Sequence, residues 1–459
     1  VVMQATPLYY RLAMSLLKPI YQLKLASKTT LPNEKQQRFG KVFPEIHTRQ
    51  PMIWCHAVSL GETNTAEPIL RDLLAQGYAL WVTNTTHTGF NRVEQLFASE
   101  IAAGKVYHSF VPVDSKAVID KFLAHVQPVA ALFIETELWG TTLAELSNRQ
   151  IATILVNGRL SEKSFKGYQK AAKLSQSMME NLSLIIAQDS DSAKRFRQLG
   201  ATSDKIRIAS SLKWSSKTNP LMLSRAEKLK QSWNLSDRAV ILAASTHEGE
   251  ELAILDSFLT VKAQYANRHP LLIIVPRHPE RFDDVAKLID SKNLPVIRRS
   301  QDGEPAKNQS VYLADSMGEL GVWYALSDIA IVGGSLVNIG GHNPIEAAIV
   351  GKPIIMGQYT QSCQLIVDQL KQAGALVQVN GSDELTQQLA HWLANPKAAQ
   401  TAGHVGQILA EKYQDATKQQ LAMIMQCIAD NKEQLIKSEI QKIDHEPVAS
   451  DSRKLIDDL

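Results

Sequence analysis

The sequence predicts an α/β protein in which two Rossmann-like domains face a cleft, preceded by a basic amphipathic helix. From Pro51 onward, short runs rich in β-branched residues alternate with longer helical patterns. That alternation is typical of parallel sheets covered by helices on both faces. It restarts near Ala239 after a polar segment, so we expect two sheets rather than one. A chain of 459 residues with 44% apolar content is long enough to bury two such cores.

The expected strands fall into two series. In the first half they cover 52–57, 79–84, 106–111, 129–135, 151–156 and 184–187. In the second half they cover 239–244, 271–275, 295–298, 329–332, 353–356 and 376–379. After about Gln407 the pattern is helical and no further strand is expected.

These patterns divide the chain into six parts. An N-terminal helix and connector (1–40) precede the first domain (41–212), and a linker (213–222) leads to the second domain (223–407). Residues 408–443 form C-terminal helices, whose return to the first domain is left open, and residues 444–459 form a charged tail.

The N-terminal helix combines apolar and cationic residues. The helix and its connector, taken up to Lys41, carry one acidic residue, Glu34. Their cationic residues are Arg11, Lys18, Lys24, Lys28, Lys35, Arg38 and Lys41. No apolar run approaches the roughly 20 residues needed to cross a bilayer. Two interpretations remain: a helix resting on an anionic membrane surface, or a helix packed on the first domain with a solvated basic face.

Overall charge and cysteine content exclude several classes of protein. The 49 basic and 46 acidic residues nearly cancel, which argues against nucleic-acid binding. Cys55, Cys363 and Cys427 are too far apart for a disulfide framework or a zinc site and favour a reducing cytoplasm. No histidine or carboxylate cluster has metal-ligand spacing, so we expect no metal.

The segment 333–346 predicts a phosphate and ribose pocket. A buried strand ends at Val332, and two glycine pairs follow, which allow the backbone to approach a ligand closely. Asn343 then has the position of a helix N-cap, with Pro344 at the first helical position. Unsatisfied N–H groups of that helix would stabilise an anion. The glycine spacing matches neither a dinucleotide fingerprint nor a P-loop, which disfavours hydride transfer and P-loop kinase activity.

Acidic residues follow two strands of the first half. Glu62 opens a helix after the first strand, so it is expected at the ligand crevice as a possible general base. The alternative is structural, because Ser59 and Glu62 have the spacing of a capping box. Glu135 and Glu137 follow another strand and are expected at the same rim, with the alternative that one points inward and one is solvated.

Polar and cationic residues close the strands of the second half. Arg277 offers a fork suited to phosphate, and Ser245 and Thr246 offer hydroxyl and amide donors. Glu319 again has capping-box spacing from Ser316. Each residue taken singly is common on a protein surface, and the argument depends on their recurrence at strand ends.

Five motifs in the same order resemble those of the bacterial 3-deoxy-D-manno-octulosonic acid (Kdo) transferases of lipopolysaccharide synthesis. They are His56-Ala57-Val58-Ser59-Leu60-Gly61-Glu62, Glu135-Thr136-Glu137-Leu138-Trp139, Pro276-Arg277-His278-Pro279, Asp315-Ser316-Met317-Gly318-Glu319 and Gly340-Gly341-His342-Asn343-Pro344-Ile345-Glu346. The likeness runs from the N-terminal helix to about residue 425. One departure is Gly140, where many family members have proline after the Trp of the second motif.

The resemblance implies an inverting GT-B glycosyltransferase that moves Kdo from CMP-Kdo onto a lipid A precursor (lipid IVA) at the cytoplasmic face of the inner membrane. Glu62 matches the family's catalytic base, and Glu135 and Lys213 match residues proposed to stabilise the transition state. Residues that match the family's CMP contacts are Arg277, His278, Met317, Gly318, Glu319, Asn343, Pro344, Ile345 and Glu346. Further candidate substrate contacts are Ser59, Gly61, Glu137, Ser245 and Thr246.

The implied partners are CMP-Kdo, the lipid acceptor and the membrane surface, with no metal or other cofactor and no nucleic acid. Two alternatives remain open. One is another GT-B glycosyltransferase or a UDP-sugar 2-epimerase, because fold alone does not determine substrate. The other is a catalytically inactive, membrane-associated binding protein.

Overall fold

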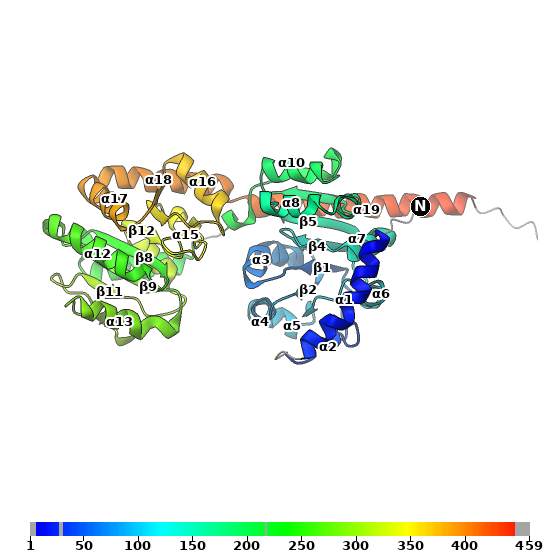
Figure 1. The fold of residues 1–459 in the computed structure, drawn as a ribbon, viewed down its shortest axis with the longest axis horizontal. Coiled ribbons are helices and arrows are strands. Elements are labelled where there is room, and N and C mark those ends of the chain that lie inside the picture. The colour runs from blue at the N-terminus through cyan, green and yellow to red at the C-terminus, as the bar shows by residue number, and fades with distance from the viewer. Residues whose placement is uncertain (1–5, 27–30, 216–217, 446–459) are drawn as a thin grey trace, which may run out of the picture. The chain divides into compact units, whose positions relative to one another are not determined.

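The computed structural model describes residues 6–26, 31–215 and 218–445. The chain divides between Leu212 and Lys213 and again between Asp415 and Ala416, which gives an N-terminal unit and a C-terminal unit. Figure 1 shows the elements of both. Most of the expected charged tail (446–459) lies outside the described residues, as do 1–5, 27–30 and 216–217.

The N-terminal unit contains a parallel sheet of seven strands. In sequence order they are β1 (Met52–His56), β2 (Ala79–Asn84), β3 (Val106–Phe110), β4 (Ala130–Ile134), β5 (Ala152–Gly158), β6 (Leu184–Ala187) and β7 (Ile206–Ile208). The spatial order is β3-β2-β1-β4-β5-β6-β7, so the direction of winding reverses between β1 and β4. The short edge strand β7 was missing from the sequence prediction, because three residues carry no readable periodicity.

Helices cover both faces of this sheet. They are α1 (Leu8–Ala26), α2 (Glu34–Arg38), α3 (Leu60–Ala75), α4 (His87–Leu96), α5 (Ala98–Ala102), α6 (Lys116–Val126), α7 (Gly140–Asn148), α8 (Glu162–Gln169), α9 (Ala172–Glu180), α10 (Ser190–Gln198) and α19 (Ala416–His445). The last of these returns from the end of the chain, and Ile424 and Ile428 on it join the buried core of the sheet. The predicted C-terminal helices therefore split between the two units, because α18 (Pro396–Tyr413) stays with the other one.

The C-terminal unit repeats the same topology. Its strands are β8 (Val240–Thr246), β9 (Leu271–Pro276), β10 (Ile297–Arg298), β11 (Val311–Leu313), β12 (Ile329–Val332), β13 (Ile354–Gly357) and β14 (Leu376–Val379). They pair in the order β10-β11-β9-β8-β12-β13-β14, so the winding reverses between β8 and β12. Strand β11 is again a three-residue strand that the sequence prediction missed.

The helices of the C-terminal unit are α11 (Pro220–Ser232), α12 (Glu250–Gln264), α13 (Phe282–Ser291), α14 (Leu320–Leu326), α15 (Ile345–Ile349), α16 (Gln364–Ala373), α17 (Ser382–Ala394) and α18. The segment expected as a linker begins within a 3-10 turn, Leu212–Ser215, and its end belongs to α11, which begins at Pro220. Asn219 caps α11 through its side chain, which accepts the N–H of Leu221.

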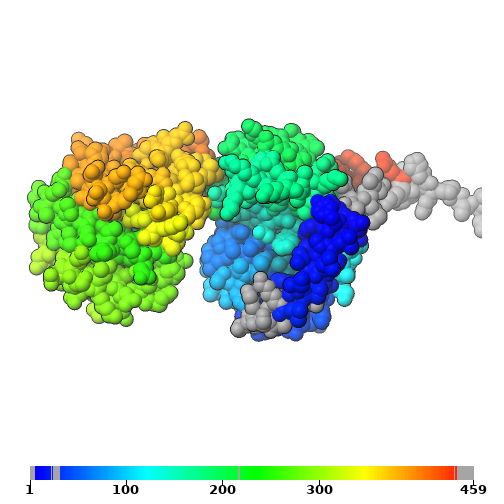
Figure 2. Space-filling model, in the orientation of Figure 1, coloured from blue at the N-terminus to red at the C-terminus, as the bar shows by residue number. Residues whose placement is uncertain are grey.

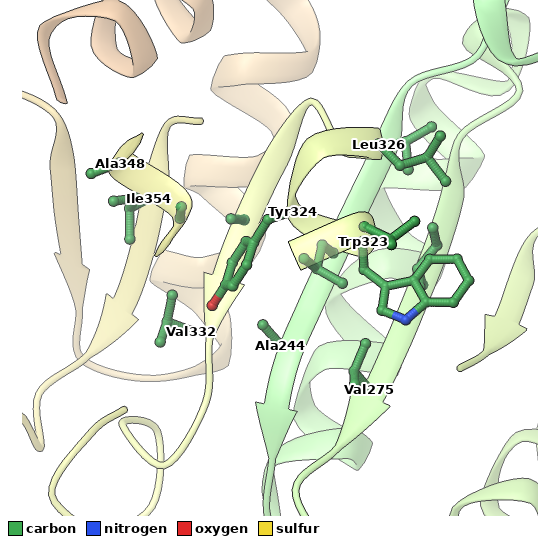
Figure 3. Close-up of a cluster of buried hydrophobic side chains, with 14 of the residues drawn as sticks. Ala244, Val275, Trp323, Tyr324, Leu326, Val332, Ala348 and Ile354 are labelled. Atoms are coloured by element: carbon green, nitrogen blue, oxygen red, sulfur yellow. The ribbon is translucent and has the colours of Figure 1, made fainter. Parts of the chain in front are cut away.

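Both sheets are buried on both faces, which explains why their strands read as continuous apolar runs. In the C-terminal unit, one face packs under α14, where the Trp323 indole is fully buried. Figure 3 shows Trp323 and Tyr324 of this short helix lying over the strands that carry Ala244, Val275 and Val332. The tight core fixes the ends of β8 and β12 relative to each other.

Helix α1 lies on the surface of the N-terminal unit, in blue in Figure 2. Its apolar side chains are largely uncovered, and each of the following is at least half exposed: Leu8, Leu12, Leu16, Leu17, Ile20 and Leu23. Such a row on one helix is unusual for a monomeric surface. Within the described part of the chain, no helix combines the length and the apolar character that a membrane span requires.

Candidate active site

Three carboxylates meet where the winding of the N-terminal sheet reverses. Glu62 lies in the first turn of α3, directly after β1, and Glu135 and Glu137 follow β4. Strands β1 and β4 are direct neighbours, with His56 beside Phe133. The negative charges of Glu135 and Glu137 both act on Glu62. The structure therefore brings together the acids that the sequence predicted at one rim, at the position where doubly wound sheets bind ligands.

Glu62 is held in a state close to half protonation at neutral pH. Burial and the two neighbouring carboxylates raise its pKa to about 7, although hydrogen bonds from the backbone oppose the shift. One of these is donated by the Val58 N–H to Oε2 at 2.5 Å. A carboxyl group with a pKa near the working pH is well suited to general acid–base catalysis.

The capping-box alternative for Glu62 is only half realised. Ser59 has the extended backbone of an N-cap, but its side chain makes no capping hydrogen bond. Glu62 does accept a backbone N–H, that of Val58, so it fixes the turn between β1 and α3 as well. This structural contact leaves the predicted role of Glu62 as a general base open. Gly61 beside it is exposed, and a Cβ there would find only the Ser59 hydroxyl within 4 Å, at 3.9 Å.

The segment Glu135–Trp139, here called the acidic loop, is tied to its neighbours at several points. Glu135 has a left-handed backbone with φ of 63°, and its N–H donates to the Val156 carbonyl at 3.0 Å. The Thr136 hydroxyl donates to the Arg159 carbonyl, and the Tyr168 hydroxyl donates to the Thr136 carbonyl. Burial raises the pKa of Glu137. A non-glycine residue in this conformation costs on the order of 1–2 kcal/mol and is typical of functional sites.

Asn157 supports this edge and was not among the predicted site residues. It is fully buried with φ of 55°, and its Oδ1 accepts the N–H of Leu212 at 2.9 Å. Its own N–H donates to Gln420 Oε1 at 3.0 Å. Asn157 thus anchors the residue before Lys213, which lies half-buried in the 3-10 turn. Asparagine tolerates positive φ, so an asparagine at a strand end was the one feature of the sequence that could have pointed to this supporting role.

The equivalent edge of the C-terminal unit is built by close backbone approach. Ser245 has φ of 54° near the end of β8, where the pairing with β9 shifts register. A Cβ at Gly333 would collide with the Ser245 carbonyl and approach the Ala244 carbonyl to 2.9 Å. Glycine is therefore required after β12. The Thr246 hydroxyl is buried and donates to Glu251 Oε1 at 2.9 Å, so it serves the protein scaffold.

Glu250 occupies backbone donors of the glycine loop that follows β12. Its buried carboxylate accepts the N–H groups of Gly334, Ser335 and Leu336 at 2.7, 3.1 and 2.9 Å. It also accepts the N–H of His247 at 2.9 Å. These loop amides therefore hold a carboxylate of the chain itself, while the predicted anion donors, the N–H groups at the helix start after Asn343, are not involved in these bonds. Glu250 was missed because its partners are about 85 residues away in sequence.

A cluster of one arginine and three histidines lies at this edge. His247 and His342 share a hydrogen bond of 2.8 Å between their Nε2 atoms, and their rings stack. His278 meets His247 edge to face, and the Arg277 N–H donates to the Thr246 carbonyl. Burial, then the charges of His247, Arg277 and His278, lower the pKa of His342 to about 4. Arg277 thus supplies a positive charge beside the three histidine rings, which suits a phosphate.

A recess of about 470 Å³ lies within the C-terminal unit. It is lined by Thr218, Asn219, Met222, Gly318, Leu320, Gly321, Glu346, Ile349 and Val350. The structure therefore brings Gly318 and Glu346 together, two residues that the sequence analysis proposed for one ligand. Glu346 reaches solvent at the rim, while the surrounding protein raises its pKa. Beside Gly318, the Met317 side chain is 57% exposed. The volume is in the range of small-molecule pockets.

Glu319 does not form the predicted capping box with Ser316. Helix α14 begins at Leu320, so Ser316 lies outside its first turn. Instead Glu319 accepts hydrogen bonds from Arg299 at 3.0 and 3.1 Å and forms an ion pair with Arg225 at 2.7 Å. Burial alone would raise the pKa of Glu319, but Arg299 and the Ser316 hydroxyl outweigh it and lower the pKa.

The N-cap of α15 is Pro344 rather than the predicted Asn343, because the helix begins one residue later than expected. The Asn343 Oδ1 accepts the Ile345 N–H at 3.2 Å, and α15 covers Ile345–Ile349. The Asn343 side chain is exposed, whereas Pro344 and Ile345 are buried and Ile345 belongs to the core. Ile345 can therefore meet a ligand only through its backbone.

Comparison with known proteins decides the family. The family model described as "3-Deoxy-D-manno-octulosonic-acid transferase (kdotransferase)" matches residues 33–216. The 3-deoxy-D-manno-octulosonic acid transferase of Haemophilus influenzae is 39% identical over 75% of this chain and 79% of its own length. The protein of the same name from Bordetella pertussis is 32% identical over 80% of this chain and 86% of its own. The chain belongs to the Kdo transferase family.

The fold agrees with this family. A glycosyltransferase from Rickettsia africae is 12% identical, with a TM-score of 0.55 over 84% of this chain and 99% of that one. At this identity the likeness concerns the fold alone, and it confirms the prediction of a GT-B architecture with two parallel-sheet domains. Membership of the Kdo transferase family supports Kdo transfer in lipopolysaccharide biosynthesis. A UDP-GlcNAc 2-epimerase from Neisseria meningitidis has the same TM-score of 0.55 at 14% identity, so the fold alone does not separate the two activities.

Proposed function

We propose that this family member is an inverting glycosyltransferase that transfers Kdo from CMP-Kdo to a lipid A precursor, lipid IVA. The observation that carries the proposal is the carboxylate of Glu62, whose pKa is raised to about 7 beside Glu135 and Glu137. A base of this kind is matched to deprotonating a sugar hydroxyl near neutral pH.

In the proposed reaction, a glucosamine hydroxyl of the acceptor attacks the anomeric carbon of Kdo. Glu62 takes the hydroxyl proton, the bond between the anomeric carbon and the phosphate oxygen breaks, and CMP leaves with the bonding electrons. The attack comes from the opposite face, so configuration inverts. Glu135 stabilises the positive charge that develops on the sugar ring, and Lys213 stabilises the departing phosphate.

The donor would be bound by the C-terminal unit. Arg277 offers a guanidinium fork for the phosphate, and His278 adds a donor beside it. The recess between Gly318 and Glu346 has room for the cytidine, with the Glu346 carboxylate as acceptor for the ribose hydroxyls. We expect no metal in this reaction, and transfer in the presence of a chelator would support that expectation.

The acceptor is a lipid, and the exposed apolar row of α1 together with Arg11 and Lys18 has the chemistry of a membrane-surface helix. We therefore expect the protein at the cytoplasmic face of the bacterial inner membrane.

The central experiment replaces Glu62 with glutamine, which keeps the shape and the acceptor for Val58 but removes the base. We expect Glu62→Gln to retain CMP binding and to lose transfer by about two to four decades, as loss of a general base does. Mass spectrometry of lipid IVA after incubation with CMP-Kdo measures the product. Glu67→Gln in the same helix is the matched control and should transfer normally, since Glu67 pairs with Arg71 on the surface.

Three outcomes would count against the proposal. Normal turnover by Glu62→Gln would leave Glu62 with its structural role alone. A wild-type protein that binds CMP but transfers no Kdo would favour the inactive binding protein instead. Thermal stabilisation by UDP rather than CMP would point to a different donor.

A further inference from the structure

The residues around the start of α1 contact the protein just beyond the acidic loop. The Thr6 hydroxyl is buried and donates to the Gly140 carbonyl at 3.3 Å. The Tyr10 hydroxyl donates to Asp114 Oδ2 at 2.7 Å. Gly140 directly follows Trp139, so two side chains from the beginning of the chain reach the end of the acidic loop.

Asp114 connects Tyr10 to the helix that continues the acidic loop. Its carboxylate is 1% exposed and accepts the N–H groups of Thr141 and Thr142 at 3.0 and 2.7 Å. It also accepts the Thr142 hydroxyl at 2.6 Å. Asp114 therefore satisfies the free N–H groups of the first turn of α7. Tyr10 is one of the donors that hold this carboxylate in place.

The contact is tightly packed as well as hydrogen-bonded. A Cβ at Gly140 would lie 2.8 Å from a Leu174 methyl carbon and 3.1 Å from both Thr6 Cγ2 and the Tyr10 ring. Elements α1, α7 and α9 thus meet at Gly140 with no room for a larger residue. Burial, and then the charge of Asp114, raise the pKa of the Tyr10 hydroxyl well above its usual range, so it remains a donor.

The acidic loop is pinned at both ends. At its start, the Glu135 N–H is bonded to Val156. At its end, the Tyr10–Asp114–Thr141 contacts fix the first turn of α7. Carboxylates between two fixed points have little freedom to move, whereas release of one end would let Glu135 and Glu137 drift. Displacements near 1 Å are enough to reduce catalysis strongly.

We propose that Tyr10 is a positioning residue that, through Asp114 and Gly140, lets the start of α1 hold the acidic loop in its working geometry. The inference rests on the proposed function, because it takes the acidic loop as part of the transfer site. It assigns α1 a second role that is separate from its exposed apolar face.

The test compares Tyr10→Phe with Tyr9→Phe in the full chain. Tyr9 is the neighbouring tyrosine of α1 and is 51% exposed, so the same change there should leave transfer unchanged. For Tyr10→Phe we expect kcat to fall about tenfold, the size typical for loss of a hydrogen bond to a charged group. The KM for CMP-Kdo should stay within about twofold, since the donor contacts are unaltered.

Hydrogen exchange gives a readout that does not depend on activity. In Tyr10→Phe, amides across 135–142 should exchange faster than in Tyr9→Phe, while amides of Val240–Thr246 should not change. The acceptor is supplied in detergent micelles, so that vesicle binding does not enter the measurement. If Tyr10→Phe does not fold, Thr6→Val replaces it, and faster exchange across 135–142 with reduced kcat is again expected.

Equal kinetics and equal exchange in the tyrosine pair would overturn the inference. A kcat that is normal with micellar acceptor and reduced only with acceptor in vesicles, with unchanged exchange, would overturn it too, because Tyr10 would then act in membrane binding. Absence of Kdo transfer by the wild-type chain would refute the proposed function instead, and the exchange data would still decide whether Tyr10 holds the loop.

Discussion

Glu62 accepts a backbone N–H that favours its charged form, while burial and two like charges favour its neutral form. The second influence is larger, so the pKa rises to about 7. A carboxylate with a raised pKa binds protons more readily in the folded than in the unfolded state. Its contribution to the free energy of unfolding is therefore lost as the pH rises from about 4.3, the ordinary value, through about 7.

Glu62→Gln should consequently stabilise the protein at high pH. We expect a gain of about 1–3 kcal/mol in the free energy of unfolding at pH 8 and a clearly smaller gain at pH 5, because glutamine mimics the protonated acid. Urea denaturation at the two pH values measures the difference. Glu67→Gln is again the control. If Glu62→Gln were no more stable than Glu67→Gln at pH 8, the surroundings of Glu62 would not disfavour its charged form.

Arg277 is the fixed cation of the histidine cluster in the C-terminal unit. Arg277→Ala should weaken CMP binding by roughly 10- to 100-fold, as expected for loss of charge-assisted hydrogen bonds to phosphate. Isothermal titration calorimetry with CMP measures the effect. Arg268 precedes β9, whereas Arg277 follows it, so Arg268→Ala is the control at the opposite end of the same strand. Unchanged affinity in Arg277→Ala would remove Arg277 from the donor site.

At the scale of elements, both sheets have the same irregularity at the carboxyl ends of their strands. A non-glycine residue takes a left-handed conformation near a strand end, namely Asn157 on β5 and Ser245 on β8, and the register of pairing shifts there. Such irregularities redirect side chains at sheet edges. In the C-terminal unit the redirected strand end approaches Gly333 so closely that no side chain fits between them.

Gly333→Ala tests this close approach. The added methyl group would press on the Ser245 and Ala244 carbonyls and force β8 and β12 apart, with an expected cost of about 1–3 kcal/mol in stability. Gly167→Ala is the contrasting variant, because no atom lies within 4 Å of a Cβ there and alanine favours the helix. Thermal unfolding distinguishes them, and equal melting temperatures would contradict the packing argument.

At the scale of the whole molecule, the chain passes between the units twice, and one buried network within the N-terminal unit anchors both passages. Gln420, just after the second passage, accepts the Asn157 N–H and donates to the Ser210 carbonyl at 2.9 Å. Asn157 in turn holds Leu212, just before the first passage. Asn157 and Gln420, which are 263 positions apart in sequence, thus fix the start of the connection that carries Lys213.

Gln420→Ala should break this anchor. We expect a loss of about 1–3 kcal/mol in the free energy of unfolding, because the buried Asn157 N–H and Ser210 carbonyl lose their partners. CMP affinity should not change. Gln419→Ala is the adjacent exposed control. If urea unfolding gave the same stability for both variants, the network would not contribute to holding the two chain passages.

Much of this architecture was readable in the sequence. The strand ends that carry Glu62, Glu135 and Arg277 and the order of the five motifs depend on neighbours within a few residues. The three-residue strands β7 and β11 were not readable, because their pairing partners alone make them strands. The Ser316–Glu319 cap was wrong because α14 begins only at Leu320, and Glu319 instead pairs with Arg299 and Arg225.

By itself, the sequence determined the α/β class, the doubled sheet and which side chains stand at the strand ends, since those follow from local periodicity. Only the tertiary structure decided their chemical state. It raised the pKa of Glu62, engaged the glycine-loop amides with Glu250, and joined Tyr10 to the acidic loop through Asp114. These effects arise from burial and from contacts between residues distant along the chain, which no local pattern encodes.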